Sequence, residues 1–329
     1  MKRKGVSYAK WGYIFSLPFV IAFLIFMLYP LCYTLYIGFT DLKGLAASNP
    51  RILEEPFKNF INIWNAETFQ IALKNTFVIW IWNFIPQISL ALLLAAWFTN
   101  NRSKVKGQGL FKVLFYMPNI ITAATVAVLF QALFGYPKGP VNDLLMSMGV
   151  IDKAFDFSVN GLAAKCIVAF IQFWMWYGYT MIVLISGILG ISPELFEASE
   201  IDGASSWQQF FYVTLPNLKT IMLFTLVTSL IGGLQMYDIP KLFLNGGPNN
   251  ATLTAAIFIQ NQAFSGSYMY NRAAAASMIM FVIIGFLSAI MFFMMRDKDE
   301  AKLHKIIKQQ EKIYKKKLKA EKMAAKEGK

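Results

Sequence analysis

Charged residues are scarce in this chain: Asp, Glu, Lys and Arg make up 15% of 329 residues, whereas a soluble domain carries about 25%. Cysteine and histidine are scarcer, with two cysteines and one histidine. Cys32 and Cys166 lie in apolar runs and give neither a disulfide framework nor a zinc-ligand pattern. The single histidine, His304, has no nucleophile or acid arranged around it in the sequence. The sequence therefore predicts no catalytic residue, no metal site and no cofactor.

Two further sequence patterns are missing. No Gly-x-x-x-x-Gly-Lys-Ser/Thr pattern occurs, so we expect no ATP hydrolysis by a phosphate-binding loop in this chain. The basic tail from Asp297 to Lys329 carries twelve lysines against six acids, but aromatic residues do not interleave with that charge. We therefore expect no nucleic acid among the partners.

Hydrophobic residues, in contrast, make up 57% of the chain, and they gather in runs of twenty or more. A helix needs about 20 apolar residues to cross the hydrocarbon layer of a membrane. The sequence predicts an all-α polytopic membrane protein with six transmembrane helices. We place these at Tyr13–Phe39, Leu73–Phe98, Val113–Phe134, Lys165–Leu189, Thr220–Tyr237 and Ala273–Met295.

The distribution of basic residues predicts the orientation. Lys and Arg cluster before the first span, between the second and third, and after the sixth, so these segments are expected in the cytoplasm together with both termini. This gives a cytoplasmic N-terminus (residues 1–12), a six-helix transmembrane domain (13–295) and a basic cytoplasmic tail (296–329). The tail has apolar residues at helical spacing, which favours a helix in solvent or on the lipid surface over a specific docking segment.

The connector between the fourth and fifth spans is cytoplasmic in this topology, yet it is acidic. Four carboxylates fall within the nine residues from Glu194 to Asp202, with no Lys or Arg among them. Ser192 and Pro193 form a helix start, Gly203 a left-handed stop, and Ser206 with Gln209 a capping box for a second helix. The sequence predicts a helix, a glycine break and another helix, which is more structure than a passive tether requires. A solvated re-entry loop with ordinary capping acids is the alternative.

These residues also carry a family resemblance. The stretch EASEIDGASSWQQFFYVTLPNL, which starts at Glu197, resembles the EAA loop of permease subunits in bacterial ABC importers. Ser199 replaces the second alanine of the family pattern, and a proline often found beyond Leu215-Pro216 is absent. The segments Leu17–Asp41 and Leu234–Thr252 are similar to the sugar-importing branch, the maltose and glycerol-3-phosphate permease type.

The resemblance implies a fold, a function and partners. The fold is the type I importer permease, in the cytoplasmic membrane of a bacterium. The function is import of a sugar, expected to be an oligosaccharide, by alternating access driven by a separate ATPase. The partners are a second related permease, two ATPase copies, an extracytoplasmic solute-binding protein and membrane lipid. The EAA loop, here residues 192–216, would dock into the ATPase through Glu197, Ala198, Glu200, Ile201, Asp202, Gly203 and Ala204.

Two helical faces are candidates for the solute path. Gln172, Trp176 and Tyr179 share one face of the fourth span and combine an amide with aromatic rings, which suit the polar and apolar surfaces of a sugar. Simple packing of this aromatic stripe on a neighbouring helix is the alternative. On the fifth span, one helical face carries the hydroxyl of Ser229, the thioether of Met236 and, at Gly233, a position without a side chain. In the maltose permease, the positions matching Tyr179 and Ser229 line the sugar site.

Several alternatives stay open at this point. The solute of such an importer can also be a polyol, glycerol phosphate or a peptide. A secondary transporter would need ionisable groups inside the spans, which are nearly absent here. Asp238, at the outer end of the fifth span, fits either an interfacial position or a contact with the solute-binding protein.

Overall fold

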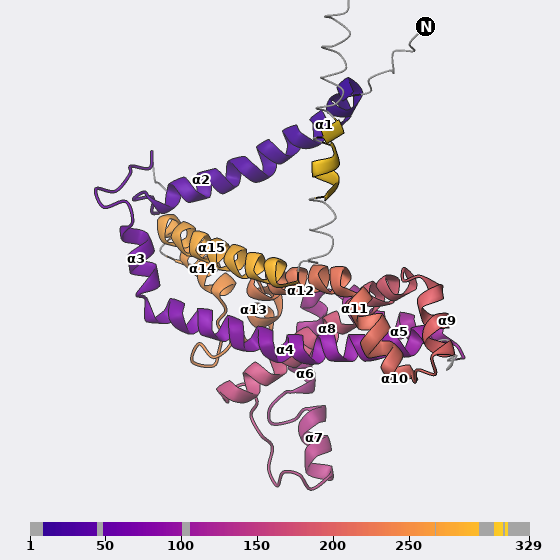
Figure 1. Ribbon diagram of the computed structural model, residues 1–329. Helices are drawn as coiled ribbons and strands as arrows, with labels where there is room; N and C mark the ends of the chain where they lie inside the picture. Colours follow the sequence, from indigo (N-terminus) through magenta and orange to yellow (C-terminus); the bar gives the residue numbers. More distant parts are fainter. Residues whose placement is uncertain are drawn as a thin grey trace, which may run out of the picture. The chain divides into compact units, whose positions relative to one another are not determined.

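The computed structural model describes residues 9–44, 49–100, 106–266, 268–295, 306–311 and 313–314. Within these residues the regular structure is helical, apart from one isolated bridge between Thr40 and Ile52 (Figure 1). The predictions made for residues 1–8, Arg102, Lys104, His304 and most of the basic tail lie outside them. The described part of that tail, residues 306–311 and 313–314, is helical.

Five helical segments are long and apolar enough to cross a membrane. They confirm the predicted spans one, two, four, five and six, with ends that differ by up to seven residues: for example, the fifth is Lys219–Leu244, against a predicted end at Tyr237. Each combines apolar length with few charges. The segments are α1 (Ala9–Phe23), η1 (Leu24–Leu28) and α2 (Tyr29–Gly38) together, α4 (Glu67–Thr99), α8 (Gly161–Leu189), α12 (Lys219–Leu234) with α13 (Asp238–Leu244), and α15 (Tyr270–Met295).

The third predicted span differs from a single continuous helix. It consists of α5 (Gln108–Ile120) and α6 (Ala123–Leu133), and the chain bends by 93° between them. The hydroxyl of Thr122 accepts a hydrogen bond from the Thr125 amide at 3.3 Å and so starts α6 as a new helix. Pro118, near the end of α5, cannot donate a backbone hydrogen bond. The segment Val113–Phe134 is therefore a bent helix pair, either one broken span or a re-entrant loop, and not the single continuous helix that was predicted.

The first of two compact units comprises residues 1–85, 121–175 and 232–285. Besides parts of the long helices it holds α3 (Lys58–Trp64), α6, α7 (Pro140–Ser147), α13 and α14 (Ala255–Phe264). One core cluster joins α6, α8 and α13, with Val126, Ile171 and Ile239 almost fully buried. A second joins α3, α4, α14 and α15 around Phe69 and Phe258, whose rings lie 5.3 Å apart.

Buried amides fasten the loops of this unit. The side chain of Asn75 in α4 donates to the carbonyl oxygens of Asn250 (2.7 Å) and Leu253 (3.2 Å). The side chain of Asn59 in α3 donates to the carbonyl oxygens of Gly38 and Thr40, both at 2.9 Å. These bonds satisfy backbone oxygens at loop positions where no helix partner exists. The loop after α13 and the end of α2 are thus fixed by side chains.

The first span makes few contacts within the chain. None of its most apolar window is buried, and every residue from Lys10 to Tyr33 is exposed. An apolar helix of this length is stable only against lipid or another apolar surface. Its outward-facing side chains must therefore be covered by groups outside this chain.

The second compact unit comprises residues 86–120, 176–231 and 286–329. Here α5 and α8 approach each other closely at Gly178, and the side-chain amide of Gln87 in α4 donates to the hydroxyl of Thr180 in α8 at 2.8 Å. Leu184, Leu218 and Leu230 are almost fully buried in this unit. The unit also contains the acidic connector, which is built on these packed helix ends.

Candidate functional site: the connector and the helical faces

The connector begins with α9, which runs from Pro193 to Ile201. Pro193 occupies the first helical turn, where its missing amide proton costs no intrahelical bond. Glu194 lies in the same turn and complements the positive end of the helix dipole. Ser192 is the N-terminal cap, as predicted, but its side chain makes no capping hydrogen bond. Proline geometry and the acid, rather than a serine cap, therefore begin this helix.

The end of α9 follows the prediction closely. Gly203 has φ +75°, the left-handed conformation that favours glycine. The amide of Ala204 donates to the carbonyl of Ser199 at 2.9 Å, and that of Gly203 donates to Glu200 at 3.0 Å. This pair of bonds is the Schellman motif, which satisfies the last helical carbonyls. The glycine break is thus an ordered turn.

The second helix starts one residue earlier than predicted. Ser205, not Ser206, is the cap: its hydroxyl accepts from the Gln208 amide at 3.4 Å, and the Gln208 side chain accepts from the Ser205 amide at 2.7 Å. The predicted capping box of Ser206 and Gln209 was wrong in register because Ser-Ser and Gln-Gln offer two equivalent spacings. The helix continues as α10 (Ser206–Gln208), η2 (Gln209–Thr214) and α11 (Leu215–Asn217).

Gln209, which takes no part in the observed capping box, links η2 to α9. Its side-chain amide donates to the hydroxyl of Ser199 at 3.0 Å, which in turn donates to the carbonyl of Phe196 at 2.7 Å. Gln209 is buried by this arrangement. It locks η2 onto the inner side of α9, so the two connector helices form one rigid element.

The end of α9 carries side chains that the described part of this chain leaves exposed. Ile201 is 87% exposed, and the acids Glu194, Glu197, Glu200 and Asp202 are all exposed. Ala198 is exposed and Ala204 half-buried. The seven residues predicted for ATPase coupling therefore lie together around the end of α9, with an apolar side chain surrounded by carboxylates. Such a surface suits a partner with an apolar recess and basic groups around it.

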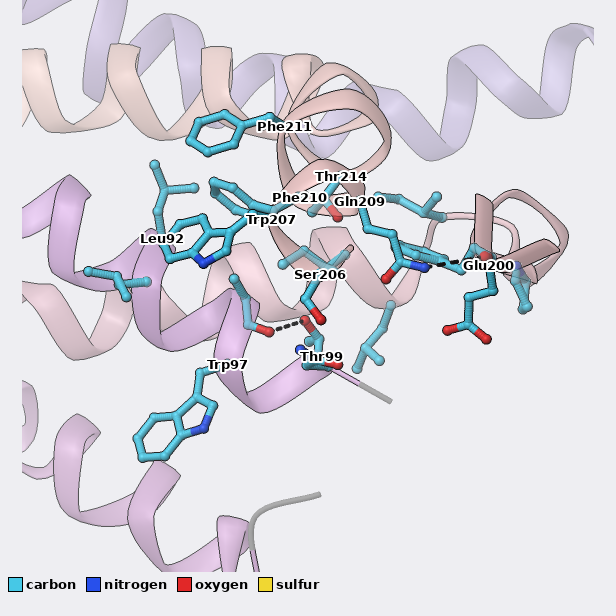
Figure 2. Close-up of a pocket in the computed structure, with 18 of the residues that line it drawn as sticks. Leu92, Trp97, Thr99, Glu200, Ser206, Trp207, Gln209, Phe210, Phe211 and Thr214 are labelled. Atoms are coloured by element: carbon cyan, nitrogen blue, oxygen red, sulfur yellow. Dashed lines mark hydrogen bonds between the residues drawn. The ribbon is translucent and has the colours of Figure 1, made fainter. Parts of the chain in front are cut away.

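A cavity of about 750 Å³ lies beneath the connector (Figure 2). It is bounded by the last turns of α4, the end of α8 and the inner side of α9 and η2, all in the second unit. Sequence reasoning did not anticipate it. Trp207, Phe210 and Phe211 line it, although Trp207 and Phe211 are 67% and 52% exposed, and the clustering of these aromatic residues was the available sequence signal.

On α8, the predicted solute face is partly open. Trp176 and Tyr179 are 45% and 38% exposed, and their rings meet edge to face at 5.9 Å between centroids. Gln172, earlier on the same helix, is half-buried and belongs to the first unit. The structure thus brings the two aromatic residues into contact and leaves both partly accessible.

On α12, the three predicted positions have different settings. Ser229 is half-buried in the second unit. Gly233 lies in the first unit, where a Cβ would overlap the indole ring of Trp80 in α4. Met236 is buried in the core cluster of that unit, and its carbonyl accepts from the hydroxyl of Thr254 at 2.9 Å. Asp238 is exposed in the first turn of α13. The setting of Met236 is therefore that of a packed residue.

Polar residues inside α4 were missed by the sequence reasoning. Asn83 and Gln87 are buried at positions four apart within the second span, and Gln87 pairs with the buried Thr180. Polar side chains within a membrane span usually face the protein interior. The spacing of Asn83 and Gln87 could therefore have been used to predict which face of α4 is buried. Among the described residues, no three His, Cys, Asp or Glu side chains are grouped as metal ligands would be.

Comparison with known proteins gives consistent matches along the chain. It is 30% identical over 289 residues to the lactose transport system permease protein LacF of Rhizobium radiobacter, covering 87% of this chain and 94% of the relative. It is 28% identical over 279 residues to the arabinooligosaccharides transport system permease protein AraP of Bacillus subtilis, covering 83% and 84%.

The fold also matches a solved structure. A chain of a bacterial alginate ABC transporter, crystallised in complex with an alginate pentasaccharide-bound periplasmic protein, aligns with a TM-score of 0.71 and 25% identity over 86% of this chain and 93% of that one. The family model of binding-protein-dependent transport system inner membrane components matches residues 75–298. This chain, a membrane-spanning transport subunit rather than an enzyme, therefore belongs to the family of inner membrane components of binding-protein-dependent transport systems.

Proposed function

We propose that this permease moves a sugar, in the form of an oligosaccharide, from an extracytoplasmic solute-binding protein into the cytoplasm. Relatives named for lactose and arabinooligosaccharides support this substrate class, as does the fold shared with an alginate importer. The exposed ring pair Trp176 and Tyr179 adds chemical support, because aromatic faces bind sugar C–H groups and their polar edges bind hydroxyls. The two permease relatives are named for sugars and not for polyols, glycerol phosphate or peptides.

The observation that carries the proposal is the exposed end of α9. Ile201 projects from an ordered helix that ends in a fixed glycine turn, and nothing in the described chain covers it. We assign Glu197, Ala198, Glu200, Ile201, Asp202, Gly203 and Ala204 to the contact with an ATPase subunit, two copies of which would serve the importer. Because Gln209 ties α9 to η2, and η2 leads through α11 into α12, a push on Ile201 moves the fifth span.

A second, related permease completes the membrane part of this importer. The support comes from the first span, whose apolar side chains are not covered by any of the residues that the structure describes. In this assembly both termini and the connector lie in the cytoplasm. ATP binding closes the ATPase pair, the connectors follow, and the solute path changes from inward-facing to outward-facing. Each state must make contacts that the other lacks, since otherwise nucleotide binding would shift no equilibrium.

Within this path we propose Gln172, Trp176, Tyr179, Ser229 and Gly233 as the residues nearest the solute. Met236, buried in its core cluster, supports them by packing. Asp238, exposed at the start of α13, is proposed as a contact for the solute-binding protein. These assignments give the ring pair the central role in solute contact.

The docking step is tested by Ile201→Ser, since this side chain is 87% exposed and its loss leaves the fold unchanged. An interface anchor contributes more than about 1 kcal/mol, so ATPase stimulation and uptake should fall roughly tenfold. Tyr212→Ser is the matched control, because Tyr212 lies on the same connector and is 80% exposed. Both variants should insert at wild-type levels. Wild-type uptake by Ile201→Ser, or an equal loss in the control, would contradict docking at the end of α9.

The substrate class is tested separately, by uptake into cells that contain the permease with its binding protein and ATPase. Radiolabelled lactose, arabinooligosaccharides, alginate oligosaccharides, glycerol phosphate and a tripeptide would be compared. We expect uptake of one of the three sugars that depends on ATP. Transport of the peptide or of glycerol phosphate alone would reject the sugar assignment while leaving the docking step untouched.

A further inference from the structure

The cavity beneath the connector shares one residue, Glu200, with the seven predicted for ATPase coupling and is otherwise lined by different side chains. Its walls are apolar side chains of α4 and η2, and polar groups come from the ends of the helices that surround it. Figure 2 shows Leu92, Trp207 and Phe210 converging from α4 and the connector. The apolar lining is formed by Leu92, Leu93, Ala96, Trp97, Ile188, Leu189, Ile191, Pro193, Phe196, Trp207, Phe210 and Phe211.

The polar lining consists of one residue within α4 and several near helix ends: Ser89, Thr99, Asn100, Glu200, Ser206, Gln209 and Thr214. Thr99 and Asn100 are the last residues at the α4 terminus, and Ser206 is the first residue of α10. The hydroxyl of Thr99 donates to the carbonyl of Ala95 at 2.8 Å, which leaves its oxygen able to accept. The Ser206 hydroxyl is able to donate. An occupant with a long apolar part and a hydrogen-bonding end therefore fits this cavity.

The cavity lies at the ends of two candidate membrane spans, α4 and α8. Leu93 and Leu189, on its border, are 59% and 71% exposed, and Trp97 and Trp207 are 50% and 67% exposed. Tryptophans gather where hydrocarbon meets water, and exposed leucines at a span are covered by lipid. These exposed apolar side chains at the ends of two candidate spans favour lipid as the occupant of the cavity.

We propose that the cavity binds one acyl chain of a membrane phospholipid. The chain lies between Leu92 and Phe210, and the glycerol ester group accepts from Ser206. The bound acyl chain fixes the distance between α4 and η2. The connector therefore keeps its position relative to α4 when a partner contacts Ile201. The proposal depends on the membrane location of the family and not on docking to an ATPase. The result of the Ile201→Ser test therefore neither supports nor overturns the lipid proposal.

The test uses the full-length chain in purified importer, with phosphatidylethanolamine that carries a diazirine in one acyl chain. After photolysis we expect label on peptides that contain residues 92–97 or 207–211. Ala96→Phe fills the cavity with a ring and should reduce this label about tenfold, a change that 1.4 kcal/mol of lost binding produces. Ala289→Phe, at an exposed position of α15, is the control and should keep the label.

Each outcome decides the proposal. Label on these peptides that disappears only in Ala96→Phe supports it. Label elsewhere on the chain, or label at equal strength in Ala96→Phe, overturns it. If Ala96→Phe does not insert, native mass spectrometry of the wild type decides: a single phospholipid retained through detergent exchange and released by Leu92→Trp supports the site. Retention of no lipid by the wild type overturns it.

Discussion

The backbone of Gly178 in α8 lies directly against the carbonyl group of Phe115 in α5. A Cβ placed on Gly178 would overlap that carbonyl and would be 2.9 Å from the Cα of Tyr116. Real Cβ atoms do not approach backbone atoms so closely, and backbone of a packed helix has little room to move. The two helices of the second unit therefore approach at this position because glycine is there.

Gly178→Ala should accordingly destabilise the protein by about 1–3 kcal/mol, the usual cost of overpacking. The expected readout is a lower midpoint of thermal unfolding in detergent and less inserted protein. Gly285→Ala is the matched control, since Gly285 is also inside a membrane helix but a Cβ added there would meet nothing within 4 Å. There alanine should be neutral or stabilising by roughly 0.5–1 kcal/mol. Equal midpoints for both variants would refute the close approach.

The hydrogen bond between Gln87 and Thr180 gives a second prediction. Both residues are buried, and the bond of 2.8 Å links α4 to α8 within the second unit. Thr180→Val keeps the shape but leaves the Gln87 amide without its acceptor, which costs about 1–3 kcal/mol. The double variant with Gln87→Leu should lose less stability than the two single variants added together. A double-mutant cycle of unfolding midpoints measures this difference, and strict additivity would show that the bond contributes nothing.

How far the sequence predicts this structure depends on what each feature requires. The length of the apolar runs correctly predicted five spans, and the presence of Gly203 correctly predicted where α9 ends. Both features depend on local sequence. The capping box came out one residue off, since Ser205-Ser206 and Gln208-Gln209 satisfy the same pattern twice. The bend after Ile120 has local signals, Pro118 and the Thr122 cap, which a count of apolar length ignores. The cavity beneath the connector depends on contacts between distant segments, which spacing alone does not contain.

Asn59 provides a third prediction, in the first unit. Its side-chain nitrogen donates to two backbone oxygens, and its oxygen accepts from Asn271 at 3.2 Å. Asn59→Asp has nearly the same shape but cannot donate, so two buried carbonyls lose their partner and face a carboxylate. We expect a loss of about 2 kcal/mol or more. Asn62→Asp, on an exposed position of the same helix, should leave the unfolding midpoint unchanged. A normal midpoint for Asn59→Asp would mean that this amide does not hold the end of α2.

The ring pair of α8 gives the last prediction, which concerns transport. If Trp176 and Tyr179 contact the sugar, Tyr179→Phe removes one hydroxyl and should raise KM for the transported sugar about tenfold, as a lost bond of 1–1.5 kcal/mol requires. Trp176→Ala should raise KM further, because stacking area is lost as well. Phe293→Ala, at a 71% exposed aromatic position of α15, serves as control. A solute contact changes the ranking of competing sugars in uptake assays, whereas a packing defect lowers the uptake of all of them equally. An unchanged ranking in both α8 variants would therefore assign the pair to packing.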